Sequence, residues 1–284
     1  MQKVFSLTRV YSLGNVLLIT ILTIGLNFGN ISINSKFIET CLMGLLFWIS
    51  CVFLLEFFHK SVDGREKFLD RYMLLIPVIL LVSILLTTAP MAIIFFILAL
   101  ISVKIYSLKS KNLPISHIVF IFRPVTELGI MFAAAAIYNY NLHNPELWIL
   151  SLLVFLISIS RNLIGDIRDV QFDRYTLPRK IGTNKTYLLS FLILLILIIL
   201  CIFNALFYAL IPLFLMSILI IIKLDPYVLH RIYIICSSFF FAFLLPISEQ
   251  SINLVIILLF ISVISNFTYN ITPRKSNPTG IEWI

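Results

Sequence analysis

The chain has 284 residues, of which 61% are hydrophobic and only 12% are charged, and its formal net charge is +8. A water-soluble domain could not cover that much apolar surface, so the composition excludes soluble classes and indicates an integral membrane protein. The positive charge does not argue for a nucleic-acid partner, because basic residues of a membrane protein chiefly report its orientation in the bilayer.

Ten apolar runs are long enough, or nearly so, to cross the roughly 30 Å hydrocarbon core as helices. In chain order they cover residues 12–30, 38–58, 73–88, 91–107, 117–138, 147–164, 187–207, 209–223, 231–246 and 253–269. Four of them have fewer than about 17 residues, so one or two could be tilted, re-entrant or joined to a neighbour. Because lipid offers no partners for backbone N–H and C=O groups, we predict an all-α bundle of nine or ten transmembrane helices.

The basic residues gather on one face when the N-terminus is placed in the cytoplasm and the chain crosses ten times, leaving only Lys36 on the other side. This pattern predicts a multi-pass protein of the cytoplasmic (inner) membrane. The four cysteines lie inside apolar runs without the spacing of metal ligands, so we interpret them as packing residues.

A charged segment after the second predicted helix recurs after the sixth. Residues 63–72 and 166–175 share the pattern Asp-x-Arg-acid-x-x-apolar-Asp-Arg-Tyr. Because each copy follows the second helix of a four-helix set, we predict a single membrane domain with two similar halves, at about 12–107 and 117–223. One or two further helices follow at the C-terminal end. Both charged segments are predicted to face the cytoplasm.

Each copy of this segment contains three acidic residues that would share one face if the preceding helix continued into the loop. Crowded carboxylates repel one another unless a cation lies among them, and Mg²⁺ prefers carboxylate oxygens together with substrate phosphate oxygens. The predicted metal ligands are Asp63, Glu66, Asp70, Asp166, Asp169 and Asp173. The alternative is an ordinary pair of charged loops whose acids pair with neighbouring bases.

Basic residues lie among these acids and would supply the positive charge that a diphosphate requires. The candidates are Arg65, Lys67, Arg71, Arg168, Arg174 and Lys180. Arg123 and Glu127, four residues apart in an apolar run, are further candidates for function, because charges within a membrane are costly. The alternative for these two is a mutually satisfied pair that braces the bundle. His117, His143 and His230 lie near predicted helix ends, which is typical of interfacial residues rather than ligands.

Residues 162–182 closely resemble the second Asp-rich motif of the UbiA-type intramembrane prenyltransferases, including the Thr-Leu-Pro and Gly that follow the acids. The resemblance implies two Asp-rich loops at the cytoplasmic mouth of a helical bundle, where Mg²⁺ and the diphosphate of a prenyl donor bind. It also implies a lateral cavity for the prenyl tail and an acceptor that is usually an aromatic ring. By the same resemblance, Tyr106 and Arg123 are expected near the diphosphate.

The first motif departs from the pattern of that family. Where Asn-x-x-x-Asp-x-x-x-Asp is expected, the chain has His59, Asp63 and Lys67, so a cation replaces one ligand. Either Glu66 and Asp70 complete the first site, or Lys67 itself contacts the diphosphate. We expect Asn162 and His59 to position ligands or water at the metal.

These observations predict Mg²⁺-dependent transfer of a prenyl group from an allylic prenyl diphosphate to a small-molecule acceptor, with an aromatic quinone or related lipid precursor as the expected acceptor. One alternative is another lipid-modifying enzyme, either a terpene cyclase or a phosphoalcohol transferase; the Asp-Gly-x-x-Ala-Arg core of the latter is absent. A second alternative is a non-catalytic cation or lipid transporter, which the internal repeat favours. Transporters, however, bind their substrates near the midplane, whereas these acids lie at helix ends.

Overall fold

The computed structural model describes residues 12–28, 34–58, 75–110, 113–138, 141–171, 175–245 and 252–271. Within these ranges the secondary structure consists of α-helices and short 3-10 turns, and no strand occurs there. The α-helices are α2 (Leu13–Phe28), α3 (Ser35–Phe58), α4 (Ile76–Thr88), α5 (Pro90–Tyr106), α6 (Arg123–Ile137), α7 (Pro145–Arg168), α8 (Leu177–Ile181), α9 (Thr183–Phe203), α10 (Leu210–Ile221), α11 (Pro226–Phe243) and α12 (Ile252–Ile271). The 3-10 turns are η3 (Ser107–Ser110), η4 (Pro114–His117), η5 (Val119–Ile121) and η6 (Phe207–Ala209).

The prediction of an all-α bundle is confirmed, since each of the ten apolar runs forms its own helix and α8 is a short addition. The largest difference in boundaries concerns α6, which we predicted from residue 117 and which begins at Arg123. Pro124 lies in the first turn of α6, where its missing N–H group costs nothing. The residues before it form the turns η4 and η5 instead.

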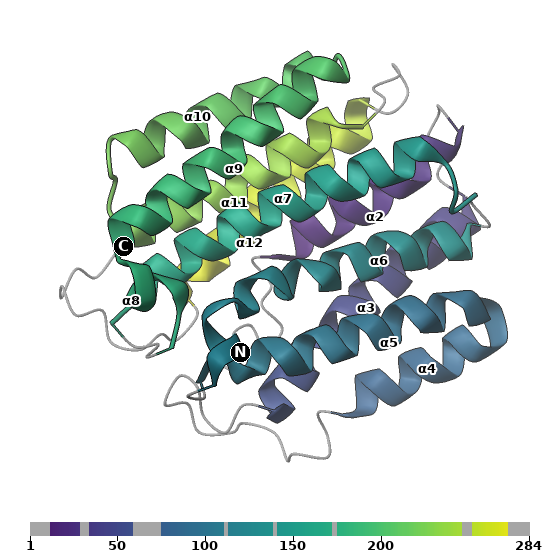
Figure 1. Cartoon of the computed structure of the whole chain (residues 1–284). Helices are drawn as coiled ribbons and strands as arrows, with labels where there is room; N and C mark the ends of the chain where they lie inside the picture. Colours follow the sequence, from purple (N-terminus) through teal and green to yellow (C-terminus); the bar gives the residue numbers. More distant parts are fainter. Residues whose placement is uncertain are drawn as a thin grey trace.

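The long helices lie side by side, with α4 near one edge of the bundle and α10 at the other (Figure 1). The helix α4 packs mainly on α3 and α5, and α10 packs mainly on α9 and α11. Between these edges, α7 contacts α6, α9 and α11. The helix that carries the second motif is therefore held from three sides.

Two apolar clusters fill the bundle. One surrounds α7 and includes the fully buried side chains of Tyr233, Phe240 and Phe241. The other lies among α3, α4, α5 and α6, where the rings of Phe47 and Phe96 meet edge to face with 4.9 Å between their centroids. The outward faces are also apolar, as on α9, which suits contact with lipid rather than water.

Five described segments are long and apolar enough to cross a membrane: Ser35–Leu55, Val119–Ile137, Pro145–Arg168, Thr183–Phe203 and Pro226–Phe243. Five further apolar helices have 10 to 17 residues. By length and composition, this is the arrangement of a multi-pass membrane protein.

Local interactions fix the ends of the helices that meet near the second motif. Asp225 caps α11 by accepting hydrogen bonds from the backbone N–H groups of Tyr227 and Val228 at 3.0 and 3.2 Å. Gly182 joins α8 to α9 with a φ of +91°, a conformation that strains residues with a Cβ. These ends hold α8, α9 and α11 beside the last turns of α7.

Candidate active site

The last turns of α7 carry buried polar side chains. Asn162 and Asp166 are 6% and 5% exposed, and Asp169 follows the last residue of the helix as its C-cap. Their spacing of four and three residues places them along one side of the helix end. The predicted helical extension of the second motif therefore includes Asp166 and stops at Asp169.

A hydrogen bond orients Asn162. Its Nδ2 atom donates to the backbone carbonyl of Phe120, in η5, over a long distance of 3.4 Å. An amide whose nitrogen is engaged in this way keeps its carbonyl oxygen available as an acceptor or metal ligand. The Ser102 hydroxyl donates to the backbone carbonyl of Phe122, so the turn before α6 is tied to both α5 and α7.

Arg168 links Asp169 to α11. Its Nε atom donates to Oδ1 of Asp169 at 2.7 Å, and its Nη2 atom lies 2.5 Å from Oδ2. Its Nη1 atom lies 3.0 Å from Nδ1 of His230. No spacing in the sequence indicates this contact of His230, and the interpretation of His230 as a purely interfacial residue misses it.

The residues on both sides of the second motif's last acid are held by contacts from α8 and from His117. Arg179, in α8, donates from Nε to the carbonyl of Val170 at 2.6 Å and from Nη2 to the carbonyl of Gln171 at 3.2 Å. Nδ1 of His117 lies 3.4 Å from the carbonyl oxygen of Thr176. The Thr-Leu-Pro of the motif thus begins α8, and the exposed Lys180 lies in its last turn.

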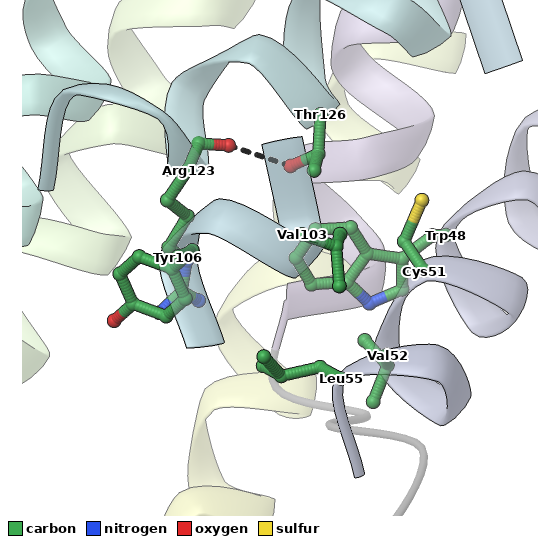
Figure 2. Close-up of a pocket in the computed structure, with 8 residues that line it drawn as sticks. All are labelled: Trp48, Cys51, Val52, Leu55, Val103, Tyr106, Arg123 and Thr126. Carbon is green, nitrogen blue, oxygen red and sulfur yellow. Dashed lines mark hydrogen bonds between the residues drawn. The ribbon is translucent and has the colours of Figure 1, made fainter. Parts of the chain in front are cut away.

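A partly open pocket, here called the cavity, lies between α3, α5 and α6 (Figure 2), and its empty space of about 320 Å³ includes part of the open space at its mouth. Its lining residues are Trp48, Cys51, Val52, Leu55, Val103, Tyr106, Arg123 and Thr126. Only Arg123 among them is charged, and its guanidinium lies over the ring of Tyr106, 5.7 Å from the centroid. The Thr126 hydroxyl donates to the Arg123 carbonyl at 2.7 Å, which fixes the first turn of α6. The cavity is apolar apart from this cationic end.

Glu127 pairs with Arg161 of α7 rather than with Arg123. The Arg161 guanidinium and the Ser158 hydroxyl both donate to the Glu127 carboxylate, and Glu127 and Arg161 are 3% and 7% exposed. The alternative of a bracing pair between Arg123 and Glu127 within α6 is therefore wrong, because the brace joins Glu127 of α6 to Arg161 of α7. Within the described part of the chain, no carboxylate pairs with Arg123.

Glu127→Ala should strongly destabilise the protein, because it leaves the Arg161 charge buried without a partner. Breaking a buried ion pair from one side costs about 3–5 kcal/mol, whereas replacing both partners by apolar groups is often neutral. We therefore expect a much lower melting temperature for Glu127→Ala and a recovery in the double variant Glu127→Leu/Arg161→Met. Thermal unfolding of the detergent-purified proteins measures both. A Glu127→Ala protein as stable as the wild type would contradict the brace.

The remaining predicted site residues lie outside the described ranges, so their roles stay predictions. They are His59, Asp63, Arg65, Glu66, Lys67, Asp70, Arg71, Asp173 and Arg174. The internal repeat also stays a prediction, because its first copy falls there. Among the described residues, no group of three or more His, Cys, Asp or Glu side chains could hold a metal ion. The donors that are described, one amide oxygen and two carboxylates, are the hard oxygen ligands that suit Mg²⁺.

Comparison with known proteins gives the family. The sequence profile of the UbiA prenyltransferase family matches residues 71–230, more than half of the chain. Comparison with curated protein sequences finds no match. The fold and the polar end of α7 define a helical membrane protein with buried polar groups at the end of one of its central helices. The chain belongs to the UbiA prenyltransferase family.

Two solved structures share the fold. One is described as digeranylgeranylglyceryl phosphate synthase in membranes, with a TM-score of 0.53 and 17% identity over 95% of this chain and 98% of that chain. The other is a UbiA homologue from Archaeoglobus fulgidus bound to DMAPP and Mg²⁺, with a TM-score of 0.54 and 16% identity over 94% of this chain and 98% of that chain. At such low identity these structures support the fold, and the resemblance found in the sequence is confirmed.

Proposed function

We propose that this protein transfers a prenyl group from an allylic prenyl diphosphate to a small acceptor in a Mg²⁺-dependent reaction. The observation that carries the proposal is the placement of Asn162, Asp166 and Asp169 at the end of α7, which the Phe120 turn joins to the cavity. Among the described residues that line this cavity, only Arg123 is charged. A prenyl diphosphate has an anionic head and an apolar tail, so its binding site requires a polar region next to an apolar one. The A. fulgidus homologue with bound DMAPP and Mg²⁺ supports the same donor class.

The second motif would hold the metal through the oxygens of Asn162, Asp166 and Asp169, together with Asp173 outside the described ranges. The first motif, which follows α3 in the chain and lies outside the described ranges, would contribute further ligands. Bound Mg²⁺ would supply charge stabilisation for the departing diphosphate.

The basic residues would bind the diphosphate and stabilise the negative charge that grows on it as it departs. We assign this role to Arg123 and Lys180 among the described residues, with Arg168 considered further below. Tyr106 holds the Arg123 guanidinium through its ring, which limits the orientations that the side chain can adopt. The apolar walls of the cavity would hold the allylic part of the donor and exclude water from it.

For the acceptor, we propose an electron-rich aromatic quinone precursor or a related lipid precursor. Its nucleophilic carbon would capture the allylic fragment, and the positioning of the two substrates would supply much of the rate enhancement. The apolar walls beside Arg123, which include Trp48 and Tyr106, support an acceptor of this kind.

The test is incubation of the purified protein with C10, C15 and C20 prenyl diphosphates and a panel of aromatic and glycerol-phosphate acceptors, with products identified by mass spectrometry. We expect a prenylated product that forms with Mg²⁺ and disappears with EDTA. Absence of product from every donor and acceptor pair, in protein shown to be folded, would contradict the proposal.

The site is proposed to face the cytoplasm from the inner membrane, because the basic residues gather on the side of the acidic loops. Single cysteines introduced at Ser61 and Thr183 should therefore react with a membrane-impermeant reagent only from the cytoplasmic side. The parent protein, whose native cysteines lie in helices of the bundle, is the control. Labelling of the two sites from opposite faces would separate the two motifs and contradict a shared active site.

A further inference from the structure

Arg168 engages both oxygens of Asp169 through a two-pronged contact. The Nε and Nη2 atoms of the guanidinium lie 2.7 and 2.5 Å from the two carboxylate oxygens. The two side chains are 17% and 26% exposed, so water screens the pair only in part. Arg168 occupies a lone pair on each carboxylate oxygen and neutralises the charge of Asp169, so it competes with a metal ion for the same group.

The other side of the same guanidinium is anchored by α11. Nη1 of Arg168 lies 3.0 Å from Nδ1 of His230. Because a guanidinium has only donors, Nδ1 is the acceptor and the proton of the neutral ring lies on Nε2. Gly165 makes room for this ring: a Cβ at that position would lie 3.2 Å from Nε2 of His230. Asp169 and His230 thus hold one guanidinium from two sides, and Gly165 leaves room for the His230 ring.

We propose that Arg168 is a resident counter-cation of Asp169, held in place by His230 as a positioning residue, and that Mg²⁺ and Arg168 compete for this carboxylate. The inference rests on the proposed function, in which Asp169 is a metal ligand. Displacement of Arg168 from Asp169 leaves a guanidinium anchored at Nη1, and its Nε and Nη2 groups then donate to diphosphate oxygens. The metal and the diphosphate then favour each other's binding, because the diphosphate takes over the cation that the metal displaces.

Substitutions of Arg168 should tighten the binding of Mg²⁺ in the absence of the prenyl donor. Arg168→Gln removes both the charge and the contact. Arg168→Lys keeps the charge, but a single ammonium cannot bridge both oxygens and still reach His230. We expect both to raise Mg²⁺ affinity by about three- to tenfold, the range for a partly exposed bidentate pair.

Variants around His230 test its positioning role without changing any charge on Arg168. His230→Leu removes the acceptor, and Gly165→Ala, which favours the helix, pushes the ring away. Each should raise Mg²⁺ affinity by about two- to fivefold, since Arg168 then holds Asp169 less firmly. His230→Asn places an amide oxygen near the position of Nδ1 and should restore the wild-type affinity.

Mg²⁺ affinity is measured on the folded protein by the displacement of bound Mn²⁺, followed by electron paramagnetic resonance, with no prenyl substrate present. Wild-type affinity in Arg168→Lys, His230→Leu and Gly165→Ala alike would overturn the inference. The variant Asp169→Asn distinguishes a failure of this inference from a failure of the proposed function. If Asp169→Asn weakens metal binding while the other variants change nothing, the inference that Arg168 competes with Mg²⁺ is wrong, and the proposed metal site stands. If Asp169→Asn leaves metal binding unchanged, the proposed metal site itself fails.

Discussion

Asp169→Asn should lower the rate of prenyl transfer by about two orders of magnitude or more. The substitution keeps the shape of the side chain and removes the charge that a hard cation requires. A rate loss of this size is expected when a metal or oxyanion anchor is lost. Because Asp169 lies directly beside Arg168, the same change also releases that guanidinium from its carboxylate. The measurement is kcat/KM for the donor at saturating Mg²⁺.

A matched control for this change lies at the start of α11. Asp225→Asn makes the same chemical substitution in the turn that precedes His230, and an asparagine keeps the N-cap that Asp225 provides. We expect Asp225→Asn to transfer prenyl groups at the wild-type rate. Asp173→Asn should behave like Asp169→Asn, because both belong to the intact second motif. Near-normal turnover in both second-motif variants would rule out the proposed metal site.

The helices of this fold could be predicted from the sequence, because a bilayer leaves a spanning segment little choice of secondary structure. The helical start of the second motif could be predicted for a related reason. The residues from Asn162 to Asp166 continue the helical spacing of α7, and their polar groups find partners within the bundle. Segment length and side-chain periodicity are local properties, so a single sequence contains them.

The contacts between helices could not be predicted in this way. Glu127 had an apparent partner four residues away in Arg123, yet it pairs with Arg161, 34 positions along the chain. His230 lies 62 positions from Arg168, and no spacing rule relates them. Which of several possible partners a buried charge meets depends on how the helices pack, and this depends on side-chain shapes along the whole interface.

The same packing separates the two charges of the first turns of α6. Glu127 faces α7 and is satisfied there, so Arg123 is left to face the cavity between α3 and α5. Two residues that lie four positions apart in one helix thus have different roles. Glu127 stabilises the bundle through its buried ion pair, whereas Arg123 is the cation proposed to bind the diphosphate.

Arg123→Met should therefore lower kcat/KM for the prenyl donor by about ten- to a hundredfold while leaving the fold intact. Hydrogen bonds to charged groups contribute about 1.5–3 kcal/mol each, and the diphosphate gains negative charge as the allylic bond breaks. Methionine keeps much of the apolar stem and removes the guanidinium. Lys185→Met, a change at an exposed lysine in the first turns of α9, removes the same charge away from the cavity and should have no effect.

Arg123→Lys distinguishes charge from geometry at this position. An ammonium supplies the positive charge, but it cannot offer two parallel donors to a phosphate or lie flat over the Tyr106 ring as the guanidinium does. We expect the lysine variant to recover part of the lost kcat/KM and Tyr106→Leu to show a smaller loss in the same direction. A Met variant within about threefold of the wild type would contradict the assignment. If only the KM for the acceptor rose, Arg123 would instead bind the acceptor, since a group that touches the departing diphosphate must change the donor kinetics.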